Sequence, residues 1–360
     1  MKPNFYKEAK DLWPMLETED YEFLKELNKT NPLLFITLSG SRGYGTCKDL
    51  INADYDFRGV MSSSKFDLLG FGNTEQYIAH DVDSGVDATI YTINKLIKLL
   101  INCNPNTIEL LGCKDYLIYH PLAIKLINKN KMFLSQRAIG SFGGYATQQF
   151  DRLENNLARF VLNQKKKEKH ILHSVKSCMS TMGDRYSSTK NQQMKLYIDT
   201  SNREELESEI FIDLNFKHYP LRDFSGIISE FNSVLRDYNK INHRNRKKDD
   251  EHLNKHAMHL IRLYYTLYDI LTKEEIITYR EDEIPILLSI RNGDFMLPDG
   301  TYRKEFFELL DDLKRKCKEA EKNTSLPKEP NMKEIEDFTI YLNEEMLNTI
   351  YLNEEMLKMM

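Results

Sequence analysis

Two neighbouring segments constrain this chain more than any other feature: an apolar run at 33–38 that leads into Gly40-Ser41, and a second run that begins with Asp54-Tyr55-Asp56. The first run predicts a buried strand, and the glycine after it allows the backbone to approach a bulky anion closely. In a second strand, Asp54 and Asp56 project from the same face because strand side chains alternate. The pair of segments therefore predicts a metal-dependent phosphate site.

The residue types at this site suggest its chemistry. Ser41 can cap a following turn or helix, while its hydroxyl and nearby N–H groups face phosphate oxygens. Two carboxylates on one face form a hard oxygen site that suits Mg²⁺, and Mg²⁺ in turn binds substrate phosphates. Two such ions can activate an attacking hydroxyl and neutralise a leaving pyrophosphate.

These motifs resemble those of a known superfamily, the DNA polymerase β-like nucleotidyltransferases. The longer patterns Gly-Ser-Arg-Gly-x-Gly and Asp-x-Asp-x-Arg-Gly are similar to those of the predicted nucleotidyltransferases called the YcgL or RlaP-like group. The resemblance covers roughly residues 33–335; one departure is Ala53, where the group often has Ser, and this should not affect the metal site. Further segments match in the same order along the chain: Asn104-Pro105-Asn106-Thr107-Ile108-Glu109-Leu110-Leu111, Lys255-x-x-Met258-His259-x-x-Arg262-Leu263 and Leu287-x-x-Ile290-Arg291-x-Gly293.

The resemblance implies a third carboxylate on a neighbouring strand, and Asp87 is the best candidate. Asp87 lies at the start of a β-branched and aromatic run of strand type. By resemblance, it would align the attacking hydroxyl and act as its base or as a metal ligand. Asp81 and Asp83 are rivals, but both precede the turn at Ser84-Gly85 and fit the same strand less well.

Two arginines and two glycines lie close to the motifs. Arg42 and Arg58 can each pair with triphosphate oxygens, because a guanidinium group suits phosphate geometry. Arg58 can equally well support the aspartates through a salt bridge. Gly43 and Gly45 can be turn residues without a role at the site.

A later segment places three polar residues on one predicted helical stripe. Lys255, His259 and Arg262 share a face because positions i, i+4 and i+7 do. We expect them to face the cleft and contact the triphosphate or the acceptor; the alternative is a polar surface stripe or a buried histidine. Glu109 is expected to complete a capping box with Asn106 and not to reach the site.

Composition fits this interpretation. A 360-residue chain with 41% hydrophobic and 29% charged residues has the composition of a globular protein and is long enough for two domains. It has neither a run of about twenty apolar residues nor a signal-peptide pattern, so we expect no membrane insertion and no secretion. Five scattered cysteines suggest a reducing cytoplasm. A net charge of -5 argues against a globally basic nucleic-acid binder.

The pattern of elements predicts an α+β fold. Strand-type runs at 33–38, 54–61 and 86–93 alternate with turns, and helix-type segments at 5–28 and 94–102 flank them. We expect a small mixed β-sheet as the nucleotidyltransferase core, with flanking helices, followed by a mainly α-helical domain.

From about residue 130 the strand signals fade, and apolar residues recur at helical spacing. The predicted parts are a catalytic domain with an N-terminal helix at 1–128, a helical domain that closes the nucleotide cleft at 129–335, and a helical tail at 336–360. Helices are expected at 134–163, 169–182, 204–212, 225–240 and 251–273.

Other segments carry less specific signals. Residues 183–203 are polar and predict an exposed loop or a poorly ordered insert. The tail repeats 339–348 almost unchanged from residue 349, which predicts a peripheral amphipathic helix. Basic clusters at 165–169 and 243–248 either guide a polyanionic acceptor or are ordinary solvated surfaces.

The sequence thus predicts a nucleotidyltransferase that uses Mg²⁺ or Mn²⁺ and moves a nucleoside monophosphate from an NTP, such as ATP, to an acceptor hydroxyl, with release of pyrophosphate. The acceptor can be a nucleic-acid end, a protein or a small molecule. One alternative is a catalytically inactive nucleotide- or RNA-binding module of the same fold, although Asp54, Asp56 and Asp87 argue against it. Another is a toxin–antitoxin or defence component that modifies tRNA or protein. The sequence does not specify the oligomeric state.

Overall fold

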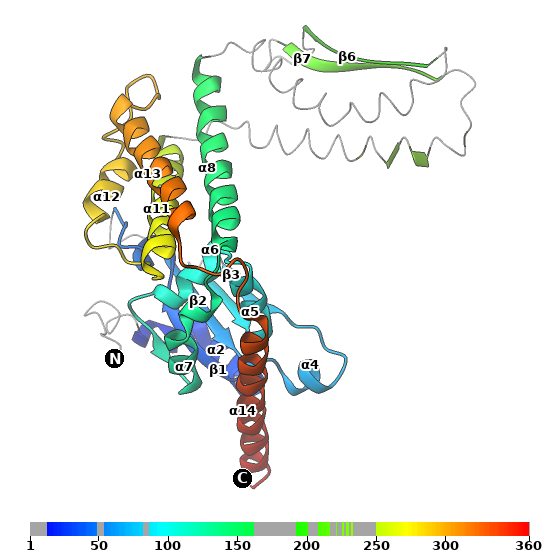
Figure 1. Cartoon of the computed structure of the whole chain (residues 1–360). Helices are drawn as coiled ribbons and strands as arrows, with labels where there is room; N and C mark the ends of the chain where they lie inside the picture. The colour runs from blue at the N-terminus through cyan, green and yellow to red at the C-terminus, as the bar shows by residue number, and fades with distance from the viewer. Residues whose placement is uncertain are drawn as a thin grey trace. The chain divides into compact units, whose positions relative to one another are not determined.

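A computed structural model of the chain describes residues 13–48, 54–81, 86–161, 192–200, 208–216 and 250–359, together with the single positions 221, 225, 226, 228, 229 and 232 (Figure 1). The chain forms two compact units. Unit 1 combines residues 1–150, 254–296 and 302–360, and unit 2 combines 151–253 with 297–301. The boundaries after residues 128 and 335 stay a prediction.

A mixed five-stranded sheet forms the centre of unit 1. Its strands are β1 (Leu33–Leu38), β2 (Tyr55–Met61), β3 (Gln76–Asp81), β4 (Val86–Thr92) and β5 (Leu117–Ile118). The order across the sheet is β3-β4-β2-β1-β5, and β2 and β4 are the parallel pair. Three of these strands confirm the runs predicted from the sequence, whereas β3 and β5 were not predicted.

One face of the sheet packs against the N-terminal helices. Tyr21 and Leu24 lie in the same buried cluster as Ile36, Phe57 and further strand residues. The rings of Tyr21 and Phe57 meet edge to face, with centroids 5.4 Å apart. Because side chains alternate along β2, its residues before and after Phe57 point to the opposite face, where the carboxylates lie.

Helices flank the sheet and follow it along the chain, so the α+β class is confirmed. The described helices are η1 (Trp13–Glu17), η2 (Glu19–Tyr21), α2 (Glu22–Thr30), α3 (Gly40–Gly43), α4 (Lys65–Leu69), α5 (Ile93–Ile101), α6 (Pro105–Ile108), η3 (Glu109–Gly112), α7 (Leu122–Asn128), η4 (Asn130–Phe133), α8 (Arg137–Val161), α11 (Asp250–Lys273), α12 (Ile284–Asn292), α13 (Lys304–Asn323) and α14 (Met332–Met359).

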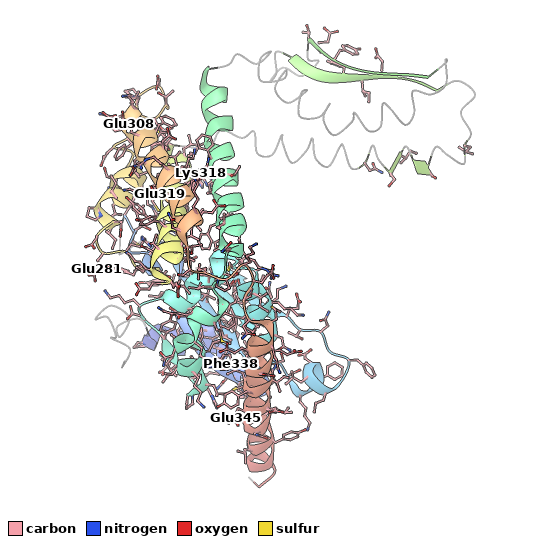
Figure 2. All side chains as sticks on the ribbon, in the orientation of Figure 1. Glu281, Glu308, Lys318, Glu319, Phe338 and Glu345 are labelled. Carbon is pink, nitrogen blue, oxygen red and sulfur yellow. The ribbon has the colours of Figure 1, made fainter. Side chains whose placement is uncertain are left out.

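α13 shows how these helices divide between core and solvent. It buries Phe306, Leu310 and residues at helical spacing beyond them, while Glu308, Lys318 and Glu319 project from it (Figure 2). No helix within the described ranges combines the length and the apolar character needed to cross a lipid bilayer.

Unit 2 contains a hairpin that corrects two predictions. β6 (Gln192–Thr200) pairs antiparallel with β7 (Ser208–Phe216), where the sequence predicted a loop at 183–203 and a helix at 204–212. Every second residue in the middle of each strand is aliphatic, namely Met194, Leu196 and Ile198 in β6 and Ile210, Ile212 and Leu214 in β7. Between them, Tyr197 stacks on its register partner Phe211 across the hairpin. The prediction failed because the partner strand, which local helical spacing does not reveal, decides the structure.

Several other predictions lie outside the described residues. These are the predicted helix at 169–182, most of the one at 225–240, and the basic clusters at 165–169 and 243–248.

α14 runs through both copies of the tail repeat and confirms the predicted helix there. Its buried stripe consists of Ile335, Phe338, Leu342, Met346 and Ile350. Because each helical residue turns by about 100°, the second copy is rotated by about 80° relative to the first. Equivalent side chains therefore differ: Ile340 is 50% exposed, whereas Ile350 is 5% exposed.

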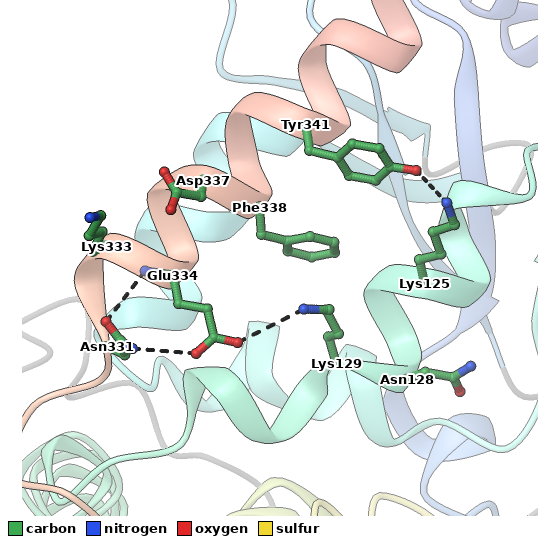
Figure 3. A pocket seen from close by; sticks show the side chains of 9 residues that line it. All are labelled: Lys125, Asn128, Lys129, Asn331, Lys333, Glu334, Asp337, Phe338 and Tyr341. Atoms are coloured by element: carbon green, nitrogen blue, oxygen red, sulfur yellow. Dashed lines mark hydrogen bonds and ion pairs between the residues drawn. The ribbon is translucent and has the colours of Figure 1, made fainter.

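A cavity of about 730 Å³ lies between α7 and the first turns of α14 (Figure 3). Lys129 extends over the ring of Phe338, with its Nζ 5.0 Å from the ring centroid, and Lys125 donates a hydrogen bond to the hydroxyl of Tyr341. Glu334 pairs with Lys129 at 3.9 Å. These contacts attach the tail helix to the helix that follows the sheet.

Phe57→Ala should lower the free energy of unfolding by about 3–5 kcal/mol, because the side chain is 2% exposed and its loss leaves a cavity against Tyr21. Phe71→Ala is the matched control: Phe71 is 99% exposed, and its truncation should change stability by less than about 0.5 kcal/mol. Urea denaturation of both variants measures the difference. Equal effects would show that the sheet does not pack as described.

Candidate active site

The sheet brings two of the predicted carboxylates side by side. Asp56 on β2 and Asp87 on β4 are register partners in the parallel pair, so both side chains leave the same face of the sheet. Asp54 lies exposed just before β2. Asp81, the rival for the third position, pairs with Val86 at the end of β3, and Asp83 lies outside the described residues.

Neighbouring charges act on Asp56. Burial raises the pKa of its carboxyl group above the usual range, and the negative charge of Asp87 raises it further. Lys255 and Arg58 oppose this shift and lower the pKa, while Asp54 contributes a smaller increase. The predicted site residues from β2, β4 and α11 therefore lie within electrostatic reach of one carboxylate.

His80 is a neighbour of this group that sequence reasoning missed. It is the register partner of Asp87 on β3, and its Nδ1 lies 3.9 Å from Oδ2 of Asp87. Both side chains are largely exposed, at 63% and 48%. β3 reads Gln76-Tyr77-Ile78-Ala79-His80-Asp81, which does not alternate between polar and apolar residues, so the sequence carries no strand signal that would have located His80.

Gly40 is required by the close approach of Asp56. Its φ of +60° is in the left-handed region, and a Cβ atom there would lie 1.6 Å from Oδ2 of Asp56. The backbone also joins the two segments, because Ser39 N–H donates to the carbonyl of Asp56 at 2.8 Å. The turn after β1 and the start of β2 thus form one compact group.

The predicted role of Ser41 as a cap is wrong. α3 begins at Gly40, so Ser39 occupies the N-cap position, and Ser41 lies inside the helix. The Ser41 hydroxyl lies 3.2 Å from Sγ of Cys47. The cap thus lies two residues earlier than expected, and Gly40, with its left-handed φ of +60°, is the first residue of the helix.

The two arginines have different surroundings. The guanidinium of Arg42 lies 3.8 Å from the ring centre of Tyr55, and its Nε donates to the carbonyl of Asp54 at 3.3 Å. Arg58 forms no ion pair within the described ranges, so the alternative of a salt bridge to the aspartates is not observed there. Its positive charge lowers the pKa of Asp56.

Arg262 differs from its prediction. Lys255 is exposed on α11, as a phosphate-binding residue would be, but Arg262 is buried and its guanidinium forms an ion pair with Glu109. The ring of Tyr44 lies against the same guanidinium, 3.7 Å from its carbon. Arg262 therefore does not face a cleft, because a buried carboxylate already balances its charge.

Glu109 also has a role other than the predicted one. The cap of α6 is Asn104, whose side chain accepts a hydrogen bond from Asn106 N–H at 3.1 Å. The Glu109 carboxylate binds Arg262 and accepts a hydrogen bond from the Tyr44 hydroxyl at 3.0 Å, and its carbonyl accepts one from Thr278 at 2.6 Å. A tertiary partner has replaced the local capping interaction.

His259 lies beside this group and contacts Tyr44. Its ring meets that of Tyr44 edge to face, with centroids 6.3 Å apart. Burial lowers the pKa of His259 well below its usual value, and the positive charges of Arg262 and Lys255 lower it further. Burial and Glu109 raise the pKa of Tyr44, so its hydroxyl stays protonated and remains a donor.

Residues that follow α11 contact the turn after β1. Arg291 donates to the carbonyl of Thr46 at 2.8 Å. A Cβ atom on Gly45, whose φ is +70°, would lie within 2.7 Å of side chains of Ile284 and Tyr279. Residues of α12 and of the segment between α11 and α12 thus contact the turn that follows β1.

The comparisons with known proteins concern the N-terminal half. Residues 16–192 match the model of one family, RlaP, described as an RNA repair pathway DNA polymerase beta family. This stretch is similar to RlaP. The resemblance to the DNA polymerase β-like nucleotidyltransferases is confirmed for these residues. No curated protein and no solved structure matches the chain. The match to RlaP includes Asp54, Asp56 and Asp87, whereas Lys255 and Arg262 lie beyond it.

Glu109→Gln should lower the free energy of unfolding by about 3–5 kcal/mol, because it leaves the buried charge of Arg262 without a counter-charge. The matched control is Glu281→Gln, which breaks the more exposed Lys114–Glu281 pair and should cost about 0–1 kcal/mol. Chemical denaturation measures both. Adding Arg262→Met to Glu109→Gln should restore part of the loss; a further large loss would contradict the pairing.

His259 should make stability depend on pH. Its pKa is lower in the folded state than in the unfolded state, so the unfolded chain binds more protons as the pH falls below about 6.5. The free energy of unfolding should therefore fall on acidification by up to about 1.4 kcal/mol per pH unit. In His259→Asn this contribution should vanish. Parallel stability curves for the two proteins between about pH 7 and 5 would contradict the assignment.

Proposed function

We propose that this chain is a Mg²⁺-dependent nucleotidyltransferase that moves a nucleoside monophosphate from an NTP, such as ATP, to an acceptor hydroxyl with release of pyrophosphate. The similarity to RlaP supports a nucleotidyltransferase-like function. The observation that carries the proposal is the register of β2 and β4, which sets Asp56 beside Asp87 next to the Gly40 turn.

The carboxylates suit Mg²⁺, and Mn²⁺ as its substitute. No three His, Cys, Asp or Glu side chains converge as a ready metal cluster among the described residues. Mg²⁺ does not need one, because one or two carboxylates, substrate phosphates and waters usually complete its octahedron. Asp56 and Asp87 would hold the ion, with Asp54 at the exposed edge. When bound, the ion would neutralise phosphate charge and acidify the attacking hydroxyl.

Two cations are suitably placed for the triphosphate. Lys255 and Arg58 both act on Asp56, and neither forms an ion pair within the described part of the chain. A guanidinium group binds phosphate oxygens in a bidentate manner, whereas an ammonium group binds them as a point charge. Burial and the neighbouring charge of Asp87 both disfavour the ionised form of Asp56 and raise its pKa, and a bound cation would stabilise that form.

Asp87 is the residue that we assign to the acceptor. Its side chain is 48% exposed, so an acceptor can reach it. The acceptor oxygen would attack the α-phosphorus and form the new P–O bond, and the bond to the β-phosphate would break. The electron pair leaves with pyrophosphate, and the hydroxyl proton passes to Asp87.

Incubation with each α-labelled NTP, Mg²⁺ and total RNA, DNA or protein tests the proposal. Asp56→Asn and Asp87→Asn should each reduce label transfer by about 10²-fold or more. Asp337→Asn, an exposed aspartate on α14, is the matched control and should transfer label normally.

Transfer that survives in both variants would contradict the carboxylate assignment. NTP binding without transfer in the parent protein would favour the alternative, a catalytically inactive nucleotide- or RNA-binding module.

A further inference from the structure

Tyr44, Glu109 and Arg262 form a buried cluster that the proposed reaction does not use. The three residues come from the turn after β1, from η3 and from α11. Glu109 and Arg262 are 3% and 4% exposed, so solvent does not screen their attraction as it would at the surface. A buried charge pair is costly to form, and this one connects α11 to the turn after β1 through Tyr44.

We propose that Glu109 and Tyr44 are positioning residues: through Arg262 they fix the orientation of α11, so that Lys255 faces Asp56. This inference rests on the proposed function, because it takes Lys255 as a phosphate-binding residue. It also assigns a task to the part of the chain beyond the RlaP match, which supplies one side of the nucleotide site.

The spacing on α11 makes this coupling specific. Lys255 and Arg262 stand at positions i and i+7, so they share one stripe about two turns apart. If α11 slipped by one residue, it would rotate by about 100° and carry Lys255 away from the carboxylates. Arg262 resists such a rotation because its guanidinium is held by the Glu109 carboxylate and lies over the ring of Tyr44, with its carbon 3.7 Å from the ring centroid.

Glu109 is well placed to transmit this constraint because its other polar atoms also have hydrogen-bond partners. Its carbonyl accepts a hydrogen bond from Thr278, and the Tyr44 hydroxyl fixes the second carboxylate oxygen. Tyr44 lies on the same turn as Gly40, which touches Asp56. A continuous path of contacts therefore runs from the carboxylate site to the helix that bears Lys255.

α11 carries a second buried pair that serves as a control. Asp269 and Arg280 are 3% and 2% exposed and form an ion pair that joins α11 to the segment after it, and within the described residues neither of the two contacts the turn from Gly40 to Gly45 directly. Asp269→Asn should therefore lower stability without altering nucleotide affinity.

A double-mutant cycle tests the inference. Calorimetry with Mg²⁺ and α,β-methylene-ATP measures the nucleotide Kd of the parent, Tyr44→Phe, Lys255→Ala and the double variant. Tyr44→Phe removes only the hydroxyl bound to Glu109 and should raise Kd about fivefold to tenfold. Lys255→Ala should raise it about tenfold or more. The double variant should bind no more weakly than Lys255→Ala alone, because the displaced residue is already gone.

Glu109→Gln, measured in the same cycle, provides a second variant if Tyr44→Phe folds poorly, and Asp269→Asn should leave Kd unchanged. Multiplicative losses in the double variant, or an unchanged Kd in both Tyr44→Phe and Glu109→Gln, would overturn the inference. An unchanged Kd in Lys255→Ala would overturn it too, together with the phosphate role of Lys255. The carboxylate chemistry is tested separately by label transfer.

Discussion

The ion pair between Glu109 and Arg262 joins two parts of the chain that are distant in sequence and that both border the candidate site. Glu109 follows the first four strands of the sheet, and Arg262 lies on α11, 153 residues later. Burial makes the pair costly unless both charges are satisfied, and here Tyr44 completes the group. The turn after β1 and α11 thus share one anchor, on which, in our proposal, the arrangement of Lys255 relative to Asp56 depends.

The sheet topology explains why carboxylates meet at this place. β4 runs parallel to β2 and brings Asp87 into register with Asp56, so two negative charges stand on adjacent strands. Such proximity is unfavourable unless a cation relieves it: burial raises the pKa of Asp56, and the charge of Asp87 raises it further. Lys255 and Arg58 relieve part of it. A site that is destabilised in this way is suited to a metal ion and a polyphosphate.

Much of the core could be predicted from the sequence because its signals are local. The apolar run at 33–38 and the alternation around Asp56 and Asp87 depend on neighbouring residues only, and these strands were found. The role of Glu109 could not be predicted, because its capping pattern is local while its actual partner is a distant arginine. The β6–β7 hairpin was missed for the same reason: the partner strand determines it.

The most direct test of the account is a crystal structure with Mn²⁺ and a non-hydrolysable NTP, in which anomalous scattering locates the ion. The account predicts a peak within about 2.5 Å of carboxylate oxygens of Asp56 and Asp87, with Lys255 Nζ within hydrogen-bond distance of a phosphate oxygen. A peak elsewhere, or phosphates bound away from the Gly40 turn and Lys255, would contradict it.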